Sequence, residues 1–258
     1  FVDKNTPSLR DFYQEEVITD EILNCEYEGI LGPVAGTIGT MLANEVLKQI
    51  LKVGQNLTDD LERLAFIRGI IGNENKLMLD CNQIWGVDEA IDYMMELKEF
   101  KPVWIEEPTA RDDIQGHIKI SSALKQYGIG VASGEQVPSP VIFKQLLQAG
   151  ALGFCQIDAT RLGGVNDVLA VILLAKKFNV PVCPHGGGIG LCNMIVHYAI
   201  WDQVKVSSHS ENQVVEYLEF LQDEVFINPI QVNNGHYVTP SSPGWGLEMT
   251  KEFFVQQD

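Results

Sequence analysis

Three short apolar runs between residues 77 and 135 end at or next to an acidic residue, namely Asp80, Glu106 and Glu135, and helix-length segments separate them. Apolar runs of this kind are typical of buried parallel strands, whose carboxyl ends lie at one edge of a sheet. Three carboxylates at one edge repel one another unless a cation lies between them. The pattern therefore predicts a divalent metal site, and hard oxygen ligands favour Mg²⁺. Glu107 is expected to point to the opposite side of its strand and is interpreted as structural.

The neighbouring apolar runs carry further ionisable residues. Lys52 belongs to the run before this group, and Asp158 and His185 belong to the two runs after it. In a closed barrel Lys52 and His185 face each other across the metal. A substrate carboxylate bound there would place its α-carbon between them, which suits abstraction of an α-proton. Asp158 would orient His185 and stabilise its protonated form, so that His185 could act as an acid.

The elements that must position these residues alternate between apolar runs and amphipathic segments. Strands are predicted at 50–53, 77–80, 103–106, 129–135, 154–158, 180–185 and 214–217, with a possible strand at 204–206, and helices at 57–71, 87–100, 114–126, 139–149, 165–178 and up to Trp201. A repeated βα unit with ionisable residues at the carboxyl ends of its strands predicts an α/β fold of the (β/α)-barrel type. Residues 50–258 are assigned to the barrel domain and residues 1–49 to a divergent N-terminal segment, in which the first strand is uncertain.

The composition excludes several classes of function. The 258 residues carry a formal net charge of −17 and no run of Lys or Arg, which argues against a nucleic-acid partner or an anionic membrane surface. No apolar stretch near the start is long enough to cross a bilayer, and no signal peptide is expected. Five Cys without a C-x-x-C pair indicate free thiols in a reducing intracellular compartment. The oligomeric state stays open and includes a homo-oligomer.

Several motifs together resemble a known family. They are Asp80-Cys81-Asn82-Gln83, Trp104-Ile105-Glu106-Glu107-Pro108, Ser133-Gly134-Glu135-Gln136, the pair Asp158 and His185, and Pro184-His185-Gly186-Gly187-Gly188. In this combination the chain resembles the mandelate racemase-type subgroup of the enolase superfamily, and within it the L-fuconate dehydratases and their animal mitochondrial relatives. The similarity covers about Lys52 to Pro243.

The resemblance implies a (β/α)7β TIM-like barrel and a Mg²⁺-dependent dehydration of a small acid sugar to a 2-keto-3-deoxy sugar acid. It also implies a mitochondrial or cytoplasmic location. The implied metal ligands are Asp80, Glu106 and Glu135, and Asn82 is an implied substrate contact. Lys52 is the implied base at C2, His185 the acid that assists loss of the 3-hydroxyl, Asp158 its orienting partner, and Glu216 a partner for the substrate carboxylate.

The chain departs from the family pattern in its first part. Ile50 replaces the first Lys of a Lys-x-Lys pair whose second member is Lys52. The N-terminal capping domain that normally closes over the sugar is expected to be absent, which affects specificity and water exclusion. Two alternatives therefore remain open: a dehydratase or epimerase acting on another acid sugar, and a catalytically defective barrel that acts as a binding partner.

Overall fold

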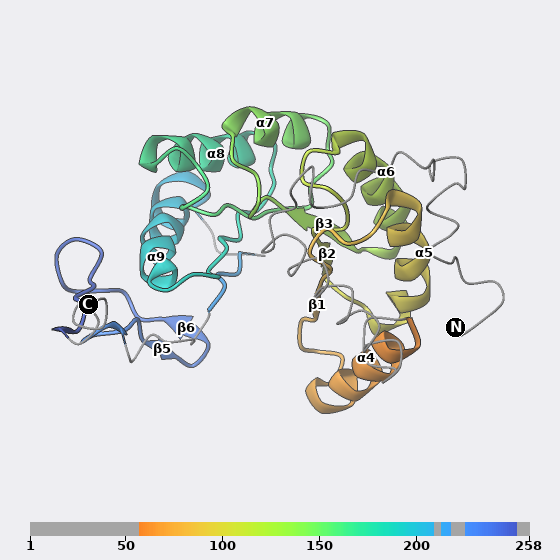
Figure 1. The fold of residues 1–258 in the computed structure, drawn as a ribbon, viewed down its shortest axis with the longest axis horizontal. Helices are drawn as coiled ribbons and strands as arrows, with labels where there is room; N and C mark the ends of the chain where they lie inside the picture. The colour runs from red at the N-terminus through yellow and green to blue at the C-terminus, as the bar shows by residue number, and fades with distance from the viewer. Residues whose placement is uncertain (1–56, 209–212, 218–224, 252–258) are drawn as a thin grey trace, which may run out of the picture. The chain divides into compact units, whose positions relative to one another are not determined.

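The computed structural model describes residues 57–208, 213–217 and 225–251 (Figure 1). The chain divides into two compact units, Phe1–Asp60 and Leu61–Asp258. Nearly all of the described residues belong to the second unit, and the fold is that of this unit. The predicted strand at 50–53, which contains Lys52, lies outside the described residues.

Four parallel strands form the main sheet in chain order: β1 (Met78–Asp80), β2 (Trp104–Glu106), β3 (Gly130–Ser133) and β4 (Phe154–Cys155). The register pairs Asp80 with Glu106, and Ser133 with Cys155. Parallel neighbours that follow each other in sequence require a crossover helix between them, so this order confirms the predicted β/α repeat.

The predicted strand at 180–185 continues the sheet without forming a full strand. Val182 makes an isolated parallel bridge to Cys155. The backbone N–H of Cys183 donates to the carbonyl of Cys155 at 2.8 Å, and the N–H of His185 donates to the carbonyl of Ile157 at 2.9 Å. These bonds place His185 at the same edge of the sheet as the carboxylates.

Helices connect the strands at the predicted places. They are α4 (Leu57–Ile71), α5 (Val87–Leu97) with the 3₁₀ turn η2 (Lys98–Phe100), α6 (Ile114–Leu124) with η3 (Lys125–Tyr127), α7 (Pro140–Gln148), α8 (Val165–Lys177) and α9 (Leu191–Trp201). Figure 1 shows α5, α6, α7 and α8 following one another on the outer side of the strands. Within the described residues, no helix is both long and apolar enough to cross a membrane.

On the face of the sheet that bears Trp104, successive strands contribute side chains to one apolar cluster. Trp104, Ala132 and Cys183 form a buried cluster, against which Met78, Val103, Phe154 and Val214 pack. Gly130 is required here, because a Cβ atom at this position would lie 2.7 Å from the Phe154 ring. The alternation of strand residues then puts the next inward position of β1 and β2 at Asp80 and Glu106.

Three late elements differ from the prediction. Residues 204–206 are not a strand, because the chain continues from α9 into a π-helical segment, η4 (Asp202–Val206), in which the N–H of Ser207 donates to the carbonyl of Asp202. Residues 214–217 are extended without strand pairing, although the N–H of Glu216 lies 3.4 Å from the Pro184 carbonyl. An unpredicted antiparallel hairpin joins β5 (Val232–Asn233) to β6 (His236–Tyr237).

The backbone at Gly134, which precedes Glu135, generates the first testable prediction. Its φ is 138°, and an added Cβ would lie 2.2 Å from the Gln156 carbonyl oxygen and 2.6 Å from the Phe143 ring. We expect Gly134→Ala to lower the free energy of unfolding by more than about 3 kcal/mol, because backbone strain and steric overlap add. Urea denaturation measures the loss.

Gly150→Ala is the matched control for this prediction. Gly150 also has a positive φ, of 67°, but nothing lies within 4 Å of an added Cβ. Only the backbone penalty of about 1 to 2 kcal/mol is expected there. Equal losses in the two variants would contradict the packing argument at Gly134.

Candidate active site

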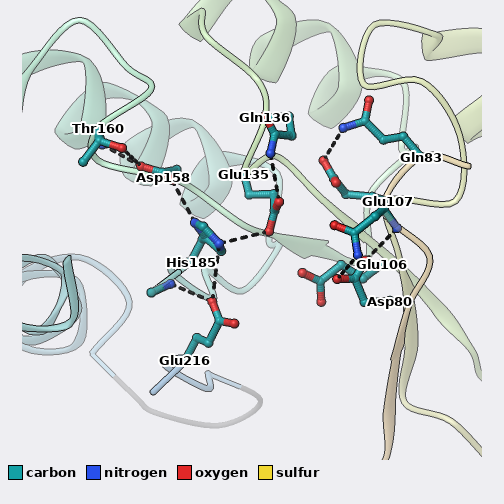
Figure 2. Close-up of polar contacts among 12 residues, drawn as sticks. Asp80, Gln83, Glu106, Glu107, Glu135, Gln136, Asp158, Thr160, His185 and Glu216 are labelled. Carbon is teal, nitrogen blue, oxygen red and sulfur yellow. Dashed lines mark hydrogen bonds and ion pairs between the residues drawn. The ribbon is translucent and has the colours of Figure 1, made fainter. Parts of the chain in front are cut away.

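The three predicted metal ligands lie at one edge of the sheet. Asp80 and Glu106 are the last residues of β1 and β2, and Glu135 follows β3 by two residues. Figure 2 shows the three carboxylates on the same side of the strands. Asn82 orients Asp80, since its backbone N–H donates to Oδ1 and its side-chain Nδ2 donates to Oδ2, both at 2.9 Å.

Burial and mutual repulsion disfavour the ionised form of these carboxylates. Burial is the main reason that the pKa of Glu106 rises to about 7, and the charges of Asp80 and Glu135 raise it further. Partial burial likewise raises the pKa of Asp80 and of Glu135. A hydrogen bond with Gln156 and the indole N–H of Trp104, which donates to Glu106 Oε2 at 3.0 Å, partly offset the rise in the pKa of Glu106.

The carboxylate oxygens of Asp80, Glu106 and Glu135 suit a hard divalent cation, although the three side chains do not converge on a single position. Within residues 57–208, 213–217 and 225–251, no group of three or more His, Cys, Asp or Glu side chains is placed to hold a metal ion as it stands. However, the charges of Asp80 and Glu135 raise the pKa of Glu106, and the charge of Asp80 raises the pKa of Glu135, so a positive charge placed between these carboxylates would favour their ionised forms. Glu135 would have to turn from His185 to join the other two.

His185 is the most highly connected side chain of the site. Its Nδ1 lies 2.8 Å from Asp158 Oδ2, and its Nε2 lies 3.3 Å from Glu135 Oε2 and 3.8 Å from Glu216 Oε2 (Figure 2). Burial alone would lower the pKa of His185, but the bond to Asp158 and the charges of Glu135 and Glu216 raise the pKa to about 9. The imidazole is therefore protonated at neutral pH and can donate a proton.

Asp158 is held in a fixed orientation opposite His185. Its Oδ1 accepts hydrogen bonds at 2.6 Å from both the backbone N–H and the hydroxyl of Thr160. Burial opposes ionisation, but the bonds from His185 and Thr160 outweigh it and lower the pKa of Asp158. The predicted Asp158–His185 pair is thus an ionised carboxylate facing an imidazolium.

Glu216 reaches the site from the extended segment at 213–217. Its Oε2 accepts the backbone N–H of Gly186 at 2.6 Å, and the Tyr237 hydroxyl donates to its backbone carbonyl. A Cβ at position 186 would lie 2.8 Å from the Glu216 carbonyl oxygen, so only glycine allows this close approach. The loop after His185 and the 213–217 segment therefore hold each other in place.

A pocket of about 540 Å³ opens beside His185. Its lining combines polar groups of Asp158, Thr160, Arg161 and His185 with the glycine-rich segment 187–190 and apolar side chains of Leu191, Met194, Phe226, Leu247 and Met249. This volume and mixed lining suit a small organic molecule with polar groups.

Sequence reasoning missed several partners of the site. Glu107 was expected to face away, but β2 ends at Glu106 and the left-handed backbone of Glu107, with φ at 42°, breaks the strand alternation. Its side chain is only 1% exposed and lies within electrostatic reach of Asp80 and Glu135. Trp104 could have been found from its i, i+2 spacing to Glu106, whereas no sequence signal marked Thr160.

The Asp158–His185 pair generates a prediction on pH dependence in the metal-free protein. Because the pKa of folded His185 is raised to about 9 from 6.5 and the pKa of Asp158 is lowered from 3.8, the pair stabilises the fold fully between pH 3.8 and pH 6.5, and this contribution is lost as the pH rises through about 9. Asp158→Asn should lower the pKa of His185 by about one to three pH units, as measured by NMR titration of the imidazole. The exposed Asp112→Asn variant serves as a control that leaves it unchanged. An unaltered pKa in Asp158→Asn would contradict the pairing.

Comparison with known proteins places this site in a family. The enolase C-terminal domain-like family model matches residues 41–253. Human mitochondrial enolase superfamily member 1 is 52% identical over 202 residues, covering 78% of this chain and 45% of the relative. L-galactonate dehydratase of Hypocrea jecorina is 50% identical over 204 residues, again covering 78% and 45%. The chain thus spans about half the length of the curated relatives it matches.

Solved structures agree with this assignment. The crystal structure of human mitochondrial enolase superfamily member 1 superposes with a TM-score of 0.74 at 52% identity, covering 78% of this chain and 45% of that chain. L-talarate dehydratase of a Polaromonas species, crystallised with Mg and L-glucarate, superposes with a TM-score of 0.67 at 26% identity, covering 78% and 52%. The predicted TIM-barrel fold is confirmed, and the chain belongs to the enolase C-terminal domain-like family.

Proposed function

We propose that this chain is the barrel part of a Mg²⁺-dependent acid-sugar dehydratase, which removes the proton α to a carboxylate and eliminates the 3-hydroxyl as water. The observation that carries the proposal is the placement of His185. Its protonated ring is bonded to Asp158 at 2.8 Å and faces Glu135 at 3.3 Å, beside the pocket of about 540 Å³. A proton donor at the edge of a carboxylate cluster suits loss of a poor leaving group such as hydroxide.

The metal assignment rests on the donor set and on the relatives. Asp80, Glu106 and Glu135 would hold Mg²⁺, which would stabilise the negative charge that builds on the substrate carboxylate when the α-proton leaves. Structural neighbours crystallised with Mg include the Polaromonas L-talarate dehydratase and the Salmonella typhimurium L-talarate/galactarate dehydratase.

In the proposed reaction Lys52, which lies outside the described residues, takes the proton from C2. The electron pair of the C2–H bond forms the C2–C3 double bond as the C3–O bond breaks. His185 donates its proton to the departing hydroxyl, which leaves as water. Asp158 stabilises the imidazolium before the transfer and keeps the ring oriented after it. The resulting enol tautomerises to the 2-keto-3-deoxy acid.

Two further residues are proposed to position the substrate. Asn82 already donates to Asp80, and its side chain is proposed to contact the sugar beside the metal. Glu216 is proposed to be a partner for the substrate carboxylate. Its Oε2 is held by the backbone N–H of Gly186 at 2.6 Å.

We propose an acid sugar of the L-fuconate type as the substrate, on the basis of the motif resemblance, and a mitochondrial location, on the basis of the relatives' name. L-galactonate dehydratase of Hypocrea jecorina supports the same chemical class. A second candidate function is a catalytically defective barrel that binds a partner without turnover. It is favoured by Ile50, which occupies the first position of the family's Lys-x-Lys pair, because loss of that Lys would weaken Lys52 as a base.

The test is proton NMR of the purified chain in D₂O with Mg²⁺ and a panel of acid sugars that includes L-fuconate and L-galactonate. We expect formation of a 2-keto-3-deoxy product. His185→Asn should lower the dehydration rate by about 10²-fold or more, since an acid catalyst is lost. The exposed His236→Asn variant is the matched control and should leave the rate unchanged.

The other outcomes separate the alternatives. Exchange of the C2 proton without product would contradict the dehydratase and favour an epimerase. Binding of Mg²⁺ without any exchange would favour the catalytically defective barrel.

A further inference from the structure

Glu107 is buried in a conformation that glutamate rarely adopts. Its side chain is 1% exposed, its φ is 42°, and it precedes Pro108, which normally pushes the preceding residue into an extended conformation. Strained positions of this kind persist only where surrounding contacts determine them, and they cluster at functional sites. The strained conformation of Glu107 is fixed by hydrogen bonds of both its backbone and its side chain.

The backbone of Glu107 joins the ends of three strands. Its N–H donates to the carbonyl of Ala132 in β3 at 2.9 Å. Its own carbonyl accepts the N–H of Gln83, after β1, at 2.9 Å and the thiol of Cys81 at 3.1 Å. The three connected elements are the ones that carry Asp80, Glu106 and Glu135.

The side chain of Glu107 extends the same connection. Its Oε1 accepts Gln83 Nε2 at 2.8 Å (Figure 2). Gln83 Oε1 accepts the backbone N–H of Arg111 at 3.0 Å. Both ends of the Gln83 carboxamide are therefore occupied, which leaves it one orientation.

Gln83 in turn fixes the turn that orients Asp80. Asn82 and Gln83 are consecutive residues with left-handed backbones, with φ values of 47° and 62°. This turn allows both donors of Asn82 to reach the Asp80 carboxylate at 2.9 Å. Without an anchor at Gln83, two strained residues in a row would relax and Asp80 would change direction.

We propose that Glu107 and Gln83 are positioning residues, and that their hydrogen bond sets Asp80 against Glu106 and Glu135 for binding of a divalent cation. This inference rests on the proposed function, because that function assigns the three carboxylates to the metal. A role confined to packing predicts that the pair affects folding but not metal affinity.

Exchanging the two side chains separates these roles. Gln83→Glu places two carboxylates side by side and breaks their hydrogen bond. In the double variant Glu107→Gln/Gln83→Glu, the new amide at position 107 donates to the new carboxylate at position 83, whose second oxygen still accepts the N–H of Arg111. The double variant therefore keeps the net charge and both hydrogen bonds of the wild type.

The readout is the affinity for Mn²⁺ alone, measured by EPR on the full chain, together with thermal unfolding in EDTA. Gln83→Glu should weaken Mn²⁺ binding by about 10-fold to 100-fold, the usual effect of losing a residue that supports a metal ligand. The negative charge that Gln83→Glu adds would by itself strengthen Mn²⁺ binding, because a carboxylate attracts the cation, so weaker binding cannot be a direct effect of that charge. The Mn²⁺ affinity of the double variant should return to within about 3-fold of the wild-type affinity, because the hydrogen bond that supports the metal ligand Asp80 is restored.

A second variant covers the case in which Gln83→Glu fails to fold. Gln83→Met removes both hydrogen bonds without adding charge, and it should show the same weakening. Wild-type affinity in Gln83→Met, or no recovery in the double variant, would overturn the inference while leaving the metal site intact. Absence of Mn²⁺ binding by the wild type would overturn the proposed metal site itself, and the inference with it.

Discussion

Repulsion among closely spaced carboxylates is the constraint on which this site depends. The parallel register places Asp80 directly opposite Glu106, and Glu135 lies two residues beyond the end of the next strand. Burial raises the pKa of Glu106 to about 7, and the other two charges add to the rise. A protein can keep such a cluster ionised only by supplying positive charge or directed N–H donors. The site holds donors to each carboxylate and is suited to accept a cation.

His185 provides part of that positive charge and links the cluster to acid chemistry. The hydrogen bond to Asp158 and the charges of Glu135, a proposed metal ligand, and of Glu216 keep the imidazole protonated. Asp158 completes the arrangement on the other side of the ring. A proton donor with a raised pKa thus arises from the charges around it, and the supporting loop depends on Gly186.

The sequence predicted those parts of the fold that depend on short-range patterns. Apolar runs ending in acids located β1 to β3 because parallel strands share one edge, and helical periodicity located the helices between them. It failed where the backbone leaves regular geometry: at Glu107, whose φ of 42° breaks the strand alternation, and at 204–206, where the chain stays helical. The β5–β6 hairpin has an Asn234-Gly235 turn signal, but its two-residue strands are not the apolar runs from which strands were predicted. Lys52 stays a prediction, since it lies outside the described residues.

Thermal unfolding with and without Mg²⁺, at pH 6 and at pH 8, tests most directly the account that carboxylate repulsion prepares this site for a cation. In the metal-free protein the raised pKa of Glu106 stabilises the fold fully below pH 4.5, and this contribution is lost as the pH rises through about 7. At the proposed site Mg²⁺ would bind the ionised carboxylates, so it should raise the Tm more at pH 8 than at pH 6. An equal shift at both pH values, or none at pH 8, would contradict the account.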